Sequence, residues 1–177
     1  MLWLNHPAIG ENKRAKNQTI KIMRKVSDQT ARRSGELFNH GFCCSESVLQ
    51  AIAESRGIQS DLVPRIATGL CAGIARTGGL CGAVSGGVLG ISLITGRSSP
   101  DAPREENHRL VRAFLNVCEA KFGSANCERL LGCRLDTPEG QSFFKEHHLR
   151  EKCAGYTSEA ARIASRLLEE SAPPQPA

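Results

Sequence analysis

The sequence predicts an all-α fold, a compact multi-helix bundle with a glycine-rich helix buried at its centre. Two observations indicate this fold: several stretches repeat apolar residues three and four positions apart, and no stretch of useful length alternates apolar with polar residues. The 177 residues are 40% hydrophobic and 23% charged, a composition typical of a globular protein. At this length we expect one helical domain over residues 17–170, between a flexible tail at 1–16 and a proline-rich tail at 171–177.

Turn and capping residues separate the expected helices. The first covers residues 19–38 and is basic and amphipathic, with Ile20, Met23 and Val26 on its apolar stripe. Later helices are expected at 44–55, at 62–74 with Asp61 as N-cap, at 81–94, at 104–122, at 124–132 with Ser124 as its cap, and at 157–170, opening at Thr157. Residues 98–103 are expected to form a loop, and residues 134–155 show no consistent pattern.

The positive charge is concentrated near the start of the sequence. Residues 1–35 hold eight basic and two acidic residues, whereas the remainder holds 15 basic and 16 acidic residues. A basic segment can bind nucleic acid or an anionic membrane, but the apolar stripe within it favours the solvent-exposed face of a packed helix. Because aromatic residues make up only 5% of the chain, nucleic acid is not expected as a partner.

Residues 78–96 form an uncharged run of 19 residues, long enough for a membrane helix. Seven of them are glycine, which contributes little apolar surface, so we expect a buried helix and no membrane insertion. On a helix, the glycines that recur every four residues form a smooth groove, into which another backbone or a bound group can fit closely. They are Gly78, Gly82, Gly86 and Gly90. A homodimer through this helix is one expected use of the groove.

No secretory signal pattern is visible, so a cytoplasmic location is expected. In a reducing compartment, cysteines stay free unless they bind metal or take part in redox chemistry. The chain has eight cysteines and no C-x-x-C pair, so any shared site must be assembled by the fold from distant segments. Four of the eight lean towards structural roles: Cys118, which lies on an apolar stripe, and Cys43, Cys71 and Cys133.

The other four cysteines, Cys44, Cys81, Cys127 and Cys153, lie at or near the starts of four expected helices. The N-terminus of a helix carries partial positive charge, which lowers the pKa of a nearby thiol and favours the thiolate that binds metal or attacks disulfides. If the four helix starts converge, they form one pocket suited to an iron–sulfur cluster, another soft metal or a dithiol pair.

Four segments resemble, in the right order, the signature of a redox-active protein family named C_GCAxxG_C_C. They are GFCCSESV at 41–48, RTGGLCGAVSG at 76–86, FGSANCERLLG at 122–132 and KC at 152–153. The resemblance extends over about residues 35–170. It implies a small helical domain with a redox or iron–sulfur role, and its four defining cysteines correspond to Cys44, Cys81, Cys127 and Cys153.

Three further cysteines depart from the pattern of this family. Cys43 stands where Asn is common, Cys71 stands where Gly is common, and Cys133 follows the Leu-Leu-Gly at 130–132. We expect these thiols either to support the ligands through hydrogen bonds or to serve as alternative ligands.

We therefore expect the four defining cysteines to bind a thiolate-ligated metal centre, first among them an iron–sulfur cluster, for electron transfer or redox sensing with a partner protein. Arg76 is expected either to hold an anionic group by charge-assisted hydrogen bonds or to cap the preceding helix. Gly78, Gly82 and Gly86 are expected beside the bound group. Two alternatives stay open: a metal-free thiol–disulfide oxidoreductase using two of the same cysteines, and a non-catalytic interaction module with structural cysteines.

Overall fold

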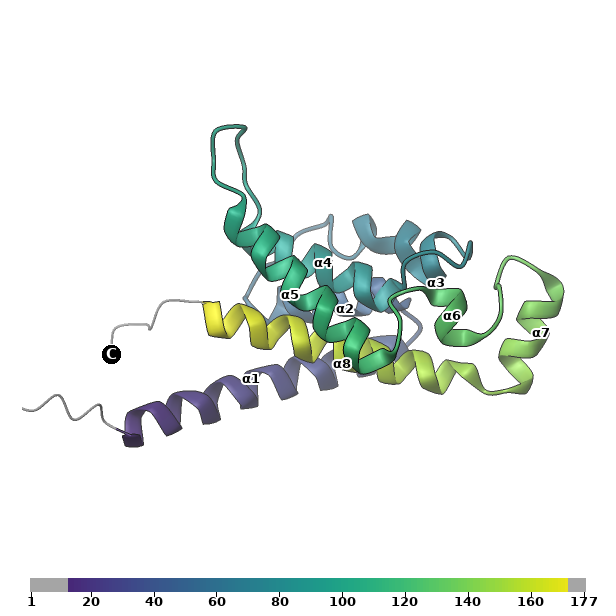
Figure 1. The fold of residues 1–177 in the computed structure, drawn as a ribbon, viewed down its shortest axis with the longest axis horizontal. Helices are drawn as coiled ribbons and strands as arrows, with labels where there is room; N and C mark the ends of the chain where they lie inside the picture. The colour runs from purple at the N-terminus through teal and green to yellow at the C-terminus, as the bar shows by residue number, and fades with distance from the viewer. Residues whose placement is uncertain (1–12, 172–177) are drawn as a thin grey trace, which may run out of the picture.

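The computed structural model describes residues 13–171, which form eight α-helices and one 3-10 helix (Figure 1). No β-strand occurs in this range, where a single antiparallel bridge joins Leu80 and Asn126. The all-α prediction is therefore confirmed. The elements are α1 (Lys13–Asn39), α2 (Cys44–Ser55), η1 (Arg65–Leu70), α3 (Cys71–Ile74), α4 (Gly82–Thr95), α5 (Glu105–Phe122), α6 (Cys127–Leu131), α7 (Pro138–Glu146) and α8 (Leu149–Ser171).

The long helix α8 is the centre of the bundle, because it packs against α1, α2, α4 and α5. Figure 1 shows α1 and α8 running antiparallel, side by side. Small polar residues join them: Thr30 and Ser165 lie 3.3 Å apart through their hydroxyl oxygens, and Ser34 donates a hydrogen bond to the carbonyl oxygen of Thr157. The prediction that the apolar stripe of α1 is buried is wrong at the start of the helix, because the Ile20 side chain is exposed.

The glycine-rich helix α4 is buried between α2 and α5, as expected from its composition. A Cβ atom on Gly86 would lie 2.6 Å from the carbonyl oxygen of Ser45, and one on Gly90 would lie 2.4 Å from Ile52. The groove is therefore real, and α2 of the same chain fills it. Gly78 lies outside α4, in the preceding turn. No helix within residues 13–171 has the length and apolar character needed to cross a membrane.

A homodimer through α4 stays a prediction, and it would have to use a face of this helix other than the one α2 covers. The predicted tails lie largely outside the described residues, although α1 begins at Lys13, within the segment expected to be a tail.

Two expected helices differ from the structure. Residues 62–74 form turns, η1 and the short α3 instead of the one helix expected after Asp61, and the side chains of Leu62 and Ile66 are exposed. The final helix begins at Leu149, so Thr157 lies within α8, where its hydroxyl donates to the carbonyl oxygen of Cys153. A threonine hydroxyl can accept a hydrogen bond from a backbone N–H at the start of a helix, or it can donate one to the carbonyl oxygen four residues earlier within a helix. The sequence alone does not distinguish these two positions.

The cap of α6 is also different from the expected one. Asn126 is the N-cap, and its side chain accepts a hydrogen bond from the backbone N–H of Arg129. Ser124 instead accepts from the backbone N–H of Asn126. The error is two residues, which leaves Cys127 in the first turn of the helix as predicted.

We expect Gly86→Ala to lower the free energy of unfolding by about 1–3 kcal/mol, because the new methyl group would push against the backbone of α2. The matched control is Gly155→Ala in α8, where a Cβ atom meets nothing within 4 Å. This control should raise the free energy of unfolding by about 0.5–1 kcal/mol. Urea denaturation of both variants measures the difference, and equal effects would contradict close packing of α2 on Gly86.

A cavity lined by six cysteines

Six of the eight cysteines line a single cavity of about 610 Å³ near the end of the bundle that carries α3, α6 and α7. They come from the first turn of α2 and the residue before it, from the start of α3, from the residue before α4, from the first residue of α6 and from the second turn of α8. They are Cys43, Cys44, Cys71, Cys81, Cys127 and Cys153. The four cysteines predicted to share a site therefore face the same cavity, together with two that were expected to be structural.

Backbone pairing holds Cys81 beside Cys127. The N–H of Cys81 donates to the carbonyl oxygen of Ala125 at 2.8 Å, and the N–H of Cys127 donates to Gly79 at 2.7 Å. The side chain of Asn126 adds a hydrogen bond to the carbonyl oxygen of Gly78 at 2.7 Å. These bonds join the turn before α4 to the start of α6, so two segments far apart in sequence place their cysteines side by side.

Cys44 reaches the cavity because Gly82 has no side chain. A Cβ atom on Gly82 would lie 2.2 Å from the sulfur of Cys44. Of the three glycines predicted beside a bound group, Gly82 lines the cavity, whereas Gly78 and Gly86 do not. Gly86 instead lies against Ser45, and a Cβ atom on Gly78 would lie 3.0 Å from Glu128.

Five consecutive residues, Ala72–Arg76, have positive φ angles between 48° and 73°. This left-handed turn costs roughly 1–2 kcal/mol for each residue other than glycine. Its backbone bonds span the loop, since Ala75 donates to Gly69 at 3.0 Å and Gly79 donates to Gly73 at 2.9 Å. The N–H of Ala72 points to the sulfur of Cys44. The strained turn therefore supplies a hydrogen-bond donor to the cavity.

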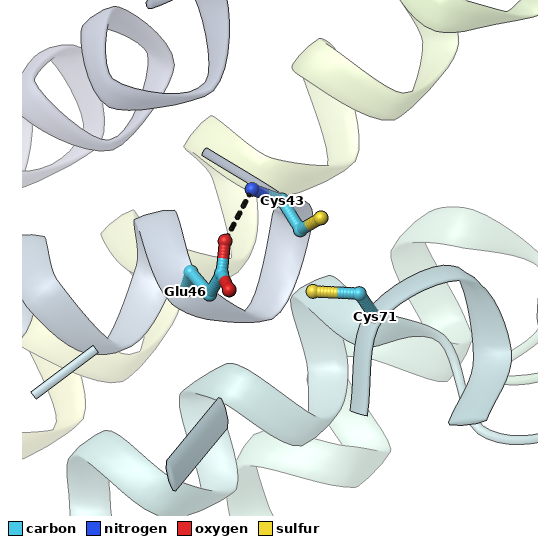
Figure 2. Close-up of side chains that lie close together, drawn as sticks. All are labelled: Cys43, Glu46 and Cys71. Atoms are coloured by element: carbon cyan, nitrogen blue, oxygen red, sulfur yellow. Dashed lines mark hydrogen bonds between the residues drawn. The ribbon is translucent and has the colours of Figure 1, made fainter. Parts of the chain in front are cut away.

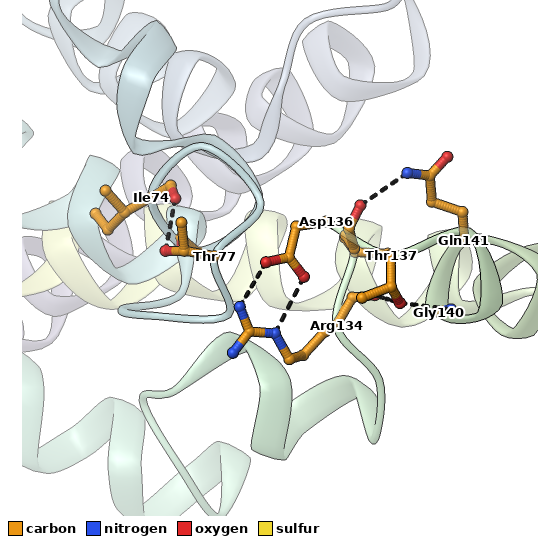
Figure 3. Close-up of polar contacts among 9 residues, drawn as sticks. Ile74, Thr77, Arg134, Asp136, Thr137, Gly140 and Gln141 are labelled. Carbon is orange, nitrogen blue, oxygen red and sulfur yellow. Dashed lines mark hydrogen bonds and ion pairs between the residues drawn. The ribbon is translucent and has the colours of Figure 1, made fainter.

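The segment between α6 and α7 forms part of the cavity wall. An ion pair between Arg134 and Asp136 and a hydrogen bond from Gln141 to the carbonyl oxygen of Leu135 stabilise the segment (Figure 3). Thr137 caps α7 by accepting from the N–H of Gly140 at 3.1 Å. Leu135 and Gln141 both line the cavity, so these local contacts fix its outer wall.

Three basic side chains and no carboxylate line the cavity in the described part of the chain: Arg76, Lys145 and Arg150. Arg150 is held by a 2.7 Å hydrogen bond to the carbonyl oxygen of Phe38 and lies over the ring of that residue. Arg76 is exposed and forms no hydrogen bond or ion pair with residues 13–171, so it does not cap the preceding helix. The cavity wall is therefore suited to a negatively charged group.

The expectation that helix starts lower the pKa of the four defining thiols is wrong. Hydrogen bonding to Cys71 and burial raise the pKa of Cys44, and burial raises the pKa of Cys81. Burial likewise raises the pKa of Cys127 and Cys153 to about 12. The N–H groups of Ala83 and Val84 favour the Cys81 thiolate, but desolvation in the cavity is the larger effect.

The low pKa belongs to Cys71, for which the sequence predicts a structural role. Hydrogen bonds from Cys44, Ser45 and Cys43 stabilise its thiolate and lower its pKa to about 6 despite burial. The hydroxyl oxygen of Ser45 lies 2.9 Å from the sulfur. One signal could have found this residue: Cys43 and Cys71 are both departures from the family pattern, and the fold brings the two together.

Cys43 and Cys71, which line the cavity, form a compact group with Glu46, which lies beside the lining (Figure 2). Their two sulfurs and a carboxylate oxygen all lie within 4.8 Å of one another. Within residues 13–171, no other group of cysteine, histidine or acidic ligands is gathered as closely. This group has the donor atoms and the spacing to hold a metal ion.

The remaining two cysteines lie outside the cavity lining. Cys118 is fully buried in the core, as predicted. Cys133 is half-buried and packs beside Cys127 and Leu131. All eight cysteines are free thiols.

A protein-family model, Putative redox-active protein (C_GCAxxG_C_C), matches residues 42–167. The chain belongs to this family. The matched range covers all four defining cysteines of the C_GCAxxG_C_C pattern and every helix from α2 to most of α8. Neither the curated proteins nor the solved structures contain a match to the chain.

We expect the reduced, metal-free protein to form one thiolate with a pKa of about 6, on Cys71. Thiolate absorbance in the ultraviolet, measured against pH, should show this first step in the wild type and in Cys133→Ser, but not in Cys71→Ser. Because folding lowers this pKa from its usual 9.0, the contribution of Cys71 to the free energy of unfolding should grow between pH 6 and pH 9. A first step above about pH 8 would contradict the hydrogen-bonded thiolate.

The left-handed turn predicts a stabilising substitution. Ala75→Gly should raise the free energy of unfolding by about 0.5–1 kcal/mol. Glycine removes the steric strain of alanine at a positive φ angle, and this gain is larger than the free energy lost because glycine makes the unfolded chain more flexible. Ala53→Gly in the buried, right-handed α2 is the control and should be destabilising. Thermal unfolding of the two variants distinguishes them, and a loss of stability in Ala75→Gly would count against the turn.

Proposed function

We propose that this family member is a redox protein in which Cys44, Cys81, Cys127 and Cys153 bind an iron–sulfur cluster for electron transfer or redox sensing. The observation that carries the proposal is that four thiols from four separate elements line one cavity. We further propose a cytoplasmic location, where reducing conditions keep the eight cysteines free, and a protein as redox partner.

The arrangement of the four thiols favours an iron–sulfur cluster rather than a single metal ion as the bound group. Thiolates bound to one tetrahedral zinc ion lie about 3.8 Å apart, given a Zn–S distance of about 2.3 Å. In the described part of the chain, no three of the four defining cysteines have sulfurs within 4.8 Å of one another. Their cavity of about 610 Å³ leaves room for a larger group between them.

The charges around the cavity also support an anionic centre. The four thiols are neutral in the metal-free protein, because their pKa values are raised, so a bound metal must displace their protons. Arg76, Lys145 and Arg150 are placed to offset the negative charge that four thiolates would bring. An iron–sulfur cluster supplies one-electron transfer.

The backbone donors of the site would tune such a centre. The N–H of Ala72 points to the sulfur of Cys44, and those of Ala83 and Val84 point to Cys81. Hydrogen bonds to ligand sulfurs, together with burial and net charge, set the reduction potential of a cluster.

Thiol–disulfide exchange is the second candidate function, favoured by the contact between Cys71 and Cys44. The Cys71 thiolate would attack a substrate disulfide and release one thiolate. Cys44 would then displace the second, leaving a Cys44–Cys71 disulfide. Two electrons pass from the two cysteines to the substrate, which is reduced to two thiols.

Metal analysis after anaerobic purification tests the first proposal against the second. We expect visible absorption, with iron and acid-labile sulfide in near-stoichiometric amounts. Cys81→Ser and Cys127→Ser should lose most of both, because each removes a ligand, whereas Cys133→Ser should keep them. Protein that stays colourless after reconstitution with iron and sulfide, yet reduces a model disulfide through Cys44 and Cys71, would overturn the cluster and favour the second function.

A further inference from the structure

Cys43, Glu46 and Cys71 form a second cluster of ligand atoms that contains none of the four defining cysteines, although Cys71 contacts Cys44. Cys43 is the N-cap of α2, Glu46 lies three residues later in its first turn, and Cys71 is the first residue of α3. Figure 2 shows the two sulfurs and the carboxylate turned towards the same space. All three ligand atoms lie within 4.8 Å of one another.

Neighbouring groups hold each ligand in place. One carboxylate oxygen of Glu46 accepts from the backbone N–H of Cys43 at 2.7 Å, and the other accepts from the hydroxyl of Thr68 at 2.6 Å. The hydroxyl of Ser45 lies within hydrogen-bond distance of the sulfur of Cys71, at 2.9 Å, and of the carbonyl oxygen of Ala67, at 2.8 Å. Metal ligands are commonly oriented by such outer hydrogen bonds, and each carboxylate oxygen keeps a lone pair for an ion.

We propose that Cys43, Glu46 and Cys71 bind one divalent cation of the zinc type, with a fourth coordination position open to solvent. Two thiolates and a carboxylate are donors that zinc accepts, whereas calcium and magnesium prefer oxygen alone. Thiolates on a tetrahedral ion lie about 3.8 Å apart, so the present spacing needs shifts of only about 1 Å.

The open position follows from where the three ligands lie. Cys71 is buried and Cys43 is exposed, so the ion would bridge the interior and the surface at the mouth of the cavity. Three protein ligands with one exchangeable position is the arrangement of catalytic zinc sites, while structural sites have four protein ligands. The ion would therefore be reachable by water or by a small ligand in the cavity.

Titration with Co²⁺ tests the proposal, because cobalt takes the place of zinc and its thiolate bonds absorb light. The background is the double variant Cys127→Ser, Cys153→Ser, which removes two defining cysteines and leaves the new site intact. We expect one Co²⁺ per chain and a thiolate-to-cobalt band. Adding Cys43→Ser or Cys71→Ser should abolish the band, adding Glu46→Gln should weaken binding at least tenfold, and adding Cys133→Ser should change nothing.

A second measurement on the wild-type protein guards against misfolding of the variants. Reduced, metal-free protein is alkylated with and without Zn²⁺, and each cysteine is quantified by peptide mass spectrometry. Zinc should protect Cys43 and Cys71, and leave the alkylation of Cys133 unchanged.

Two results would overturn the proposal. They are cobalt binding that is insensitive to Cys43→Ser, and zinc that fails to protect Cys43. Iron and sulfide content is measured separately in Cys43→Ser, where the cluster proposal expects no loss. Failure of one proposal is therefore distinguishable from failure of the other.

Discussion

The short backbone pairing between residues 78–81 and 125–128 is the constraint on which the cavity depends. Two hydrogen bonds, from Cys81 to Ala125 and from Cys127 to Gly79, tie the start of α4 to the start of α6. This pairing fixes the start of α6 beside α4, while α7 is held by its packing against α8. The bridge at Leu80 and Asn126 is the only strand-like pairing within residues 13–171, and it lies directly beside two of the thiols.

Much of the helical layout was predictable because its signals are local. The range of α2 matches the expected 44–55, since its apolar spacing and the Gly57 that follows it are read from adjacent residues. The region 62–74 was not predictable in the same way. Its left-handed turn packs against α6, where a Cβ atom on Gly73 would lie 2.5 Å from Cys127. The spacing of apolar residues along the sequence gives no information about that contact.

The candidate site shows the same division between local and non-local information. The resemblance and the helix starts selected four cysteines that face one cavity, but the expected electrostatics were wrong. Partial charges at a helix start are local, whereas the desolvation that outweighs them at Cys81 arises from the whole surrounding wall. Cys71 was missed for a related reason, because its hydrogen bonds come from Cys43, Cys44 and Ser45, more than 20 residues earlier.

The small residues of α4 have a steric role in the packing of the bundle. In the run from Cys81 to Gly86, Gly82 makes room for the sulfur of Cys44, Ala83 is fully buried, and Gly86 admits the backbone of α2. Gly82 and Gly86 thus mark where α4 touches α2. A descendant that lost its thiols yet kept these small residues would inherit the architecture without the chemistry.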